Sequence, residues 1–172
     1  MSLSASVSRK ATQSAMEEQK DVTQVTIEEP PMTCEQTRTL MTHLVENNNL
    51  VPEFKTNRTH LREDFLLRLM DICACFSAEK FSKHSAVTVT VDELIFQHTL
   101  LSFGELISAY SQVNKAWGTS MEIGVFCEAE DFQTGGVRKI CSAYFTFVSL
   151  DQNKKKIRLP PLSHGKYHQL TI

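Results

Sequence analysis

The apolar segment from Leu66 to Phe76 contains a single carboxylate, Asp71. An ionised carboxylate in an apolar helix is costly unless it lies on an exposed stripe or serves a site that needs its charge. Helical spacing supports a stripe, because polar residues recur at intervals of three and four along this segment: Asp64, Arg68, Asp71, Cys75 and Glu79. The sequence therefore allows two interpretations of Asp71, a solvated helix edge or a positioned base that accepts a proton.

Other residue types that carry chemistry form no recognisable pattern. The histidines His60, His84 and His98 lack the spacing and the neighbouring Cys or Asp of a ligand set, so we expect no metal site. No nucleophile elbow, P-loop or dinucleotide fingerprint is present. The five cysteines are odd in number and form no CxxC pair, which predicts reduced thiols in a cytosolic-type compartment.

The composition is that of a globular chain with one core. Of 172 residues, 41% are hydrophobic and 22% are charged, and the net charge of −2 gives no reason to expect nucleic acid as a partner. No apolar run approaches the roughly 18–20 residues that span a bilayer, so we expect no membrane span.

The first part of the chain is polar, and we expect residues 1–31 to be disordered up to Pro30 and Pro31. The polar segment from Met1 to Lys20 has no apolar stretch of a signal peptide. Arg9 and Lys10 hint at a transit peptide, but Glu17 and Glu18 argue against one. The expected location is cytoplasmic, with a mitochondrial location less favoured.

The remaining elements must position Asp71. The pattern predicts a short helix over 32–49, an edge strand over 50–54, a polar connection over 56–60 and the long helix over 61–80. Residues Glu63 and Asp64 fall in the first turn of that helix, where the helix dipole favours acidic side chains.

After the helix the apolar period changes from 3.6 to 2. Four strands are predicted, with Gln133–Gly136 as a hairpin turn before the last of them: 87–92, 105–114, 121–129 and 137–150. In the first of these strands Val87, Val89 and Val91 alternate with polar residues and predict a half-buried strand. One apolar helix followed by antiparallel strands is an α+β pattern, and we expect a curved sheet wrapped around the helix.

The order of these elements and their residues resembles the hotdog-fold acyl-CoA thioesterases, nearest the branch of cytosolic acetyl-CoA hydrolase and brown-fat-inducible thioesterase. Four stretches carry the resemblance: Leu66–Cys75 with its acidic residue, Val87–Asp92 with Phe96, Trp117–Ile123 with an aromatic-x-Thr/Ser-Ser-Met-Glu signature, and Ala143–Val148. The likeness covers roughly residues 50–161. It implies a single hotdog domain over 32–162, followed by a short tail over 163–172.

The resemblance implies an enzyme that hydrolyses acyl-CoA to a free acid and CoA. It places the catalytic acid at Asp71 and an asparagine of the partner domain at Asn57, so it also implies a homodimer or higher homo-oligomer. Backbone N–H groups near the start of the helix would stabilise the oxyanion. CoA is part of the substrate, and no resident cofactor is expected.

The resemblance assigns CoA binding to two segments, Val89-Thr90-Val91 and Thr119-Ser120-Met121; their alternative interpretation is plain strand and turn. Candidate phosphate partners are Arg58, Lys115, Lys154–Lys156 and Arg158.

This chain departs from the family in front of the helix. The segment between Asn57 and Asp71 is one residue short, and family glycines are replaced by other residues: Thr59, His60, Leu61 and Arg62. The departures favour an alternative function, a weakened hotdog module that binds acyl-CoA or pairs with a complete thioesterase. A hydratase on the same fold is disfavoured, because the central helix has no histidine.

Overall fold

The computed structural model describes residues 30–52, 59–97 and 101–163, with residues 51, 52, 59 and 60 described by their backbone alone. The predicted disorder of residues 1–31 and the predicted tail over 163–172 lie almost wholly outside these ranges. Both therefore stay predictions.

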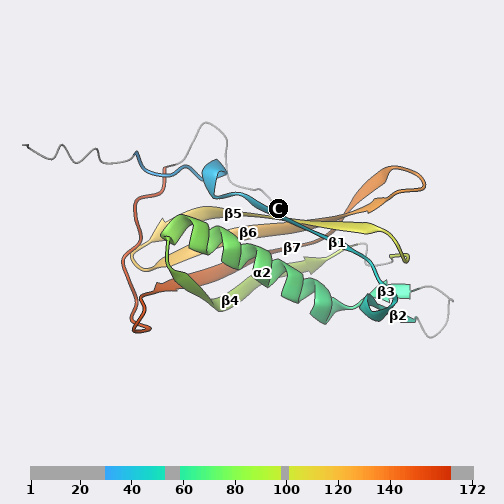
Figure 1. Ribbon diagram of the computed structural model, residues 1–172, viewed down its shortest axis with the longest axis horizontal. Coiled ribbons are helices and arrows are strands. Elements are labelled where there is room, and N and C mark those ends of the chain that lie inside the picture. Colours follow the sequence, from blue (N-terminus) through green and yellow to red (C-terminus); the bar gives the residue numbers. More distant parts are fainter. Residues whose placement is uncertain (1–29, 53–58, 98–100, 164–172) are drawn as a thin grey trace, which may run out of the picture. The chain divides into compact units, whose positions relative to one another are not determined.

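Five antiparallel strands form one sheet, in the order β1-β5-β6-β7-β4. Their bounds are β1 Thr39–Leu44, β4 Ser85–Phe96, β5 Leu106–Trp117, β6 Ser120–Asp131 and β7 Gly136–Leu150. The long helix α2 (Glu63–Ser82) runs across one face of this sheet (Figure 1). The α+β class and the hotdog arrangement are thus confirmed, with all four predicted strands present and longer than expected.

The helix predicted over residues 32–49 is wrong. This segment forms a 3₁₀ turn η1 (Glu35–Thr37), then β1, then a second 3₁₀ turn η2 (Asn47–Asn49). Strand β1 pairs with β5 from Thr39↔Ser111 to Leu44↔Leu106. A spacing of four suits a helix but is also an even number, so Leu40 and Leu44 share one face of a strand. That face is the exposed one, with Leu40 55% exposed.

The short strands β2 (Leu50–Pro52) and β3 (Thr59–Leu61) pair into a separate ribbon next to the start of α2. The predicted edge strand is therefore confirmed for residues 50–52, while residues 59 and 60 form a strand where a connection was expected. Residues 53–58 between the two strands lie outside the described part of the chain.

Helix α2 is buried on one face only. Its large side chains Leu66, Met70 and Phe81 are almost fully buried against the sheet, whereas Phe76 on the opposite face is 50% exposed. The sheet therefore covers the helix but does not enclose it. Lys83, in the left-handed conformation at φ 59°, ends the helix and donates its N–H to the Glu79 carbonyl at 2.9 Å. Within the described ranges, no helix is long and apolar enough to cross a membrane.

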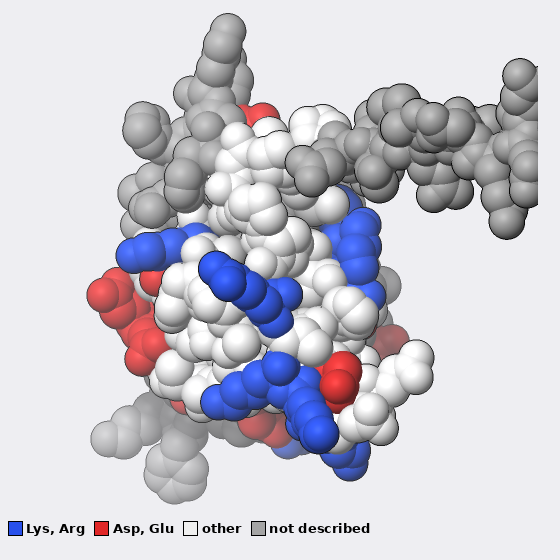
Figure 2. Space-filling model, turned by 90° about the vertical axis from the view of Figure 1, so that its left-hand side faces the viewer, with Lys and Arg blue, Asp and Glu red and all other residues white. Residues whose placement is uncertain are grey.

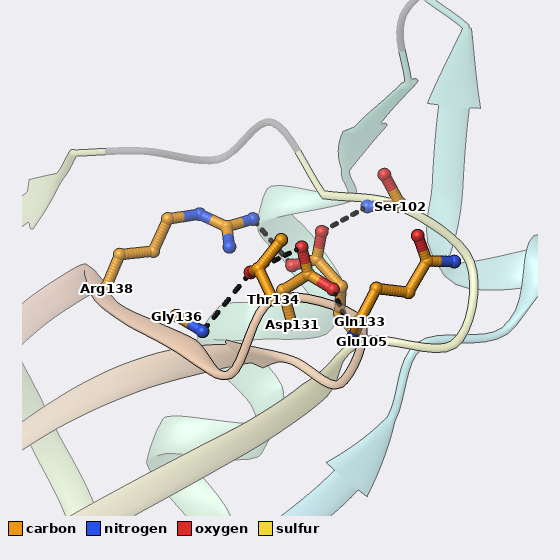
Figure 3. Close-up of polar contacts among 7 residues, drawn as sticks. All are labelled: Ser102, Glu105, Asp131, Gln133, Thr134, Gly136 and Arg138. Carbon is orange, nitrogen blue, oxygen red and sulfur yellow. Dashed lines mark hydrogen bonds and ion pairs between the residues drawn. The ribbon is translucent and has the colours of Figure 1, made fainter.

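The predicted hairpin turn joins β6 and β7 (Figure 3). The Asp131 carboxylate accepts the Gln133 N–H at 2.8 Å and the Thr134 hydroxyl at 3.0 Å, and these hydrogen bonds lower the pKa of Asp131. Beside the turn, Arg138 pairs with the nearly buried carboxylate of Glu105 at 2.5 Å. These contacts hold the two strands in register at this end of the sheet.

Candidate functional site

Asp71 lies at the edge of the buried face of α2, beside β4. The Thr88 hydroxyl donates a hydrogen bond to Asp71 Oδ1 at 2.6 Å. Asp71 is partly exposed, so water reaches the carboxylate while one of its oxygens is fixed. A short hydrogen bond to a charged acceptor is a strong one. Asp71 is therefore a carboxylate with one oxygen hydrogen-bonded to β4 and with access to solvent, and its role as a base stays a prediction.

A β-bulge lies next to this contact. Thr88 pairs with Phe147 and Thr90 pairs with Thr146, which leaves Val89 as an extra residue on β4. A bulge bends a strand and redirects its side chains, and such bulges are over-represented near active sites. Here it separates Thr88, which faces α2, from Thr90, which faces the other side of the sheet.

The predicted burial of the valines on β4 is wrong. Val87, Val89 and Val91 are 45%, 61% and 38% exposed, and Thr88 between them turns toward the helix. Strand β4 is the terminal strand of the sheet, and no further strand of the described residues pairs with its outer edge. The sequence analysis missed Thr88 because the alternation of apolar and polar residues assigned its side chain to the solvent side. Thr88 and Asp71 are also 17 residues apart in the chain, so no short motif indicates their contact.

The two predicted CoA-binding segments lie on strands separated only by β7. Residues 89–91 belong to β4 and residues 120–121 to β6, and both strands pair with β7. At the spacing of adjacent strands they are about 10 Å apart. Thr88, Phe147 and Met121 form one row across the three strands.

The side chains of these segments differ in access. Val89 and Thr90 are exposed and Ser120 is half-buried, whereas Met121 is fully buried in the core. Only the backbone of Met121 can face a ligand. Thr119 lies in the turn before β6, where its carbonyl accepts the Ser149 N–H at 3.2 Å.

The predicted partner of Asp71 cannot be placed. Asn57, like Arg58, lies outside the described residues. The start of α2 is described, and Asp71 is about two turns, or roughly 12 Å along the axis, beyond Glu63. The oxyanion donors expected at the helix start therefore do not reach the Asp71 carboxylate of the same chain.

A cleft lies at the β5–β6 turn. It has a volume of about 240 Å³ and is lined by Ala116–Gly118 and by the segment 158–162. Leu159 donates its N–H to the Gly118 carbonyl at 2.9 Å, and the Lys115 ammonium lies 5.9 Å from the centre of the Trp117 ring. Figure 2 shows lysine and arginine side chains gathered at this end of the fold, where α2 and β7 end.

Four of the cysteines are buried, and the half-buried Cys75 lies one turn beyond Asp71 on α2. Burial, with the nearby Glu79 and Asp71 carboxylates, raises the pKa of the Cys75 thiol. Cys141 lies 3.3 Å from the Met70 sulfur beneath the helix, and the hydrogen bond with the Cys141 thiol, together with burial, raises the pKa of Cys127. Buried thiols of this kind are unreactive and act as core side chains.

Curated relatives of the chain are thioesterases, although no family model matches it. The mouse acetyl-coenzyme A thioesterase is 35% identical over 111 residues, which is 64% of this chain and 20% of that protein. The mouse cytosolic acyl coenzyme A thioester hydrolase is 28% identical over 83% of this chain and 36% of its own length. The chain thus spans about a fifth of the first of these relatives and just over a third of the second.

Solved structures with the same fold are acyl-CoA hydrolases. The Bacillus cereus acyl-CoA hydrolase is 25% identical, with a TM-score of 0.72 over 80% of both chains. The Staphylococcus aureus acyl-CoA hydrolase, in complex with butyryl coenzyme A, coenzyme A and coenzyme A disulfide, is 20% identical, with a TM-score of 0.70 over 80% of both chains. Variants of that enzyme with an aspartate or a threonine replaced by alanine have also been solved. A hexameric thioesterase from Yersinia pestis is 21% identical, with a TM-score of 0.62 over 70% of this chain and 93% of that one.

Proposed function

Because the chain is a hotdog-fold relative of the acyl-CoA thioesterases, we propose that it hydrolyses acyl-CoA to a free acid and CoA. The observation that carries this proposal is the Asp71 carboxylate, fixed by Thr88 at 2.6 Å and open to water. In the S. aureus enzyme the replaced aspartate and threonine are 17 positions apart, as are Asp71 and Thr88. That spacing supports treating the pair as one unit.

In the proposed reaction Asp71 accepts a proton from a water molecule, and the water oxygen attacks the thioester carbonyl carbon. The tetrahedral intermediate collapses with cleavage of the C–S bond. The proton held by Asp71 then passes to the departing CoA sulfur, so the carboxylate is restored. Thr88 keeps one Asp71 oxygen fixed, which leaves the other to bind the water. The reaction needs no resident cofactor.

The second half of the site comes from a second copy of the chain in this proposal. Asp71 and the start of α2 are about 12 Å apart within one copy, so one chain cannot bring both to one carbonyl group. An antiparallel pair of helices would bring the helix start and Asn57 of one copy to Asp71 of the other. Asn57 would then orient the water or the carbonyl.

The edge of β4 is the surface we assign to this self-association. It is a terminal strand of 12 residues with five large apolar side chains more than a third exposed: Val87, Val89, Val91, Leu94 and Ile95. An open edge of this kind pairs readily with another strand. The Y. pestis thioesterase is hexameric, which is compatible with a dimer as the repeating unit.

CoA binding is assigned to residues 89–91 and 119–121. The first segment directly follows Thr88 and includes the bulged residue Val89, so it could contact the pantetheine arm with the thioester near Asp71. The anionic nucleotide would reach the end of the fold in Figure 2, where Lys154–Lys156 and Arg158 are exposed. With a cytosolic thioester hydrolase among its relatives, we place the protein in the cytoplasm.

An alternative function is a module that binds acyl-CoA without hydrolysing it. The replaced glycines and the shortened segment before α2 favour this alternative, because a glycine lets the backbone approach a substrate closely.

The test is thioester hydrolysis by the full chain, measured with acyl-CoA of several lengths and with Asp71→Asn as the control. Hydrolysis by the parent and a large loss in the variant support the proposal. No hydrolysis at any length, together with calorimetric binding of a non-hydrolysable acyl-CoA, would establish the alternative.

A further inference from the structure

A cluster of buried hydroxyl groups lies between α2 and the strand pair β1–β5. Thr39 Oγ1 is 2.6 Å from Ser111 Oγ and 2.9 Å from Ser77 Oγ, and the two serine oxygens are 2.7 Å apart. Ser77 and Ser111 are fully buried. Three hydroxyl groups from a helix and two strands thus meet within mutual hydrogen-bonding distance.

Backbone carbonyls accept the protons of this cluster. Ser77 donates to the Thr37 carbonyl at 3.0 Å, and Ser111 donates to the Cys73 carbonyl at 2.8 Å. Thr39 reaches the same Cys73 carbonyl at 3.1 Å. Each hydroxyl has one proton and a carbonyl acceptor within reach, and these carbonyl contacts join α2 to the segment before β1, to β1 and to β5.

The strand side of the network is itself fixed. Thr37 accepts the Val113 N–H at 2.9 Å, which ties the segment before β1 to β5. Farther along α2, the Lys80 ammonium donates to the Arg38 carbonyl at 2.8 Å. One flank of α2 is thus held by directional polar contacts, whereas the rest of its buried face packs through apolar side chains.

The opposite flank of α2 carries Asp71. Strands β1 and β4 are the two edges of the sheet, and α2 contacts both, through the hydroxyl network at β1 and through Asp71 and Thr88 at β4. Apolar packing alone permits small rotations of a helix about its axis. At a helix radius of about 5–6 Å with side chains, a rotation of about 20° moves a side-chain end by roughly 2 Å. That shift is large enough to break a 2.6 Å hydrogen bond.

We propose that Thr39, Ser77 and Ser111 are positioning residues that fix the rotation of α2 and thereby hold Asp71 against Thr88. The proposal rests on the proposed function for its catalytic consequence. Its structural core, the coupling between the two flanks of the helix, is independent of activity. None of the three hydroxyl groups needs to touch substrate.

The structural test is a double-mutant cycle between Asp71→Ala and Thr88→Val, each of which removes the hydrogen bond between the two side chains, measured from the chemical-denaturation midpoints of the full chain. It is run in the parent, in Thr39→Val and in Thr42→Val. Thr42 is the matched control, since it lies on β1 with its side chain on the exposed face. We expect the coupling between Asp71 and Thr88 to be lost in Thr39→Val, retained in Thr42→Val and restored by Thr39→Ser.

Ser111→Ala, which removes a single oxygen atom, replaces Thr39→Val if that variant does not fold. An unchanged coupling in the variant that folds overturns the proposal, whether or not the parent hydrolyses acyl-CoA. If hydrolysis is observed, kcat should fall about tenfold in Thr39→Val with KM unchanged, because only the orientation of the base is affected. A fall in stability with kcat intact would make the network purely structural and would also overturn it.

Discussion

The contact between Asp71 and Thr88 determines what the carboxylate can do. A carboxylate on a freely exposed helix edge samples several rotamers and binds water without direction. Thr88 removes that freedom by occupying Oδ1 at 2.6 Å, and the partial burial of Asp71 strengthens the contact. The second oxygen can then accept a hydrogen bond from a water molecule in a defined direction. A residue of this kind suits proton transfer, in which geometry limits the rate.

Asp71→Asn should preserve shape and remove the proton acceptor. We expect turnover to fall by about 10²–10⁴-fold, the range for a positioned base, while binding of a non-hydrolysable acyl-CoA persists. Glu79→Gln is the matched control on the same helix, because Glu79 lies about two turns beyond Asp71 and far from the helix start. Equal turnover in the two variants would place Asp71 on a solvated stripe.

Thr88→Val keeps the β-branched shape and removes the hydrogen bond to Asp71. We expect kcat to fall about tenfold with KM nearly constant, since the base remains but loses its orientation. Thr88→Ser retains the hydroxyl and should recover most of the activity. Steady-state kinetics of both variants provide the measurement, and a Thr88→Val enzyme with the parent kcat would contradict the positioning role.

At the scale of elements, periodicity predicted α2 and β4–β7, because each has a long and unambiguous pattern. The helix predicted over residues 32–49 was wrong, because the spacing of Leu40 and Leu44 fits one face of a helix and one face of a strand equally well. Only the pairing with β5 decides between the two. Thr88 could not be found from alternation, because contact with α2 and the bulge at Val89 set which side chains of β4 face the helix. Both failures have one cause, contacts between residues far apart in the chain.

The exposed edge of β4 should be the surface through which two copies associate. Ile95→Lys places a charge on that edge, outside the segment assigned to CoA, and should shift the protein toward monomer in analytical ultracentrifugation at micromolar concentration. Leu40→Lys is the matched control, because Leu40 is a 55% exposed residue on β1, the other edge of the same sheet. If Leu40→Lys dissociates the protein and the substitution on β4 does not, the interface lies at β1 and the proposed surface on β4 is wrong.

At the scale of the molecule, charge is distributed unevenly despite a net charge of only −2. The exposed cations Lys154, Lys155, Lys156 and Arg158 follow β7, and Lys83 follows α2. Both elements end on the same side of the fold (Figure 1). Local concentration of cations attracts an anionic ligand even where the net charge is near zero. This end therefore suits the phosphates of CoA, whereas the acyl group would be held near α2.

Replacing Lys154, Lys155 and Lys156 by alanine should raise KM for acyl-CoA and leave kcat nearly unchanged, since the phosphates are remote from the thioester and contribute binding alone. The parent kcat/KM should fall as salt rises, because exposed charges are screened over about 8–10 Å at physiological ionic strength, and the variant should respond less. An acyl-pantetheine without phosphates is the control substrate and should be hydrolysed equally by parent and variant. A variant that lost as much activity toward acyl-pantetheine as toward acyl-CoA would show that the lysines support the fold or the thioester site, and the phosphates would have to bind elsewhere.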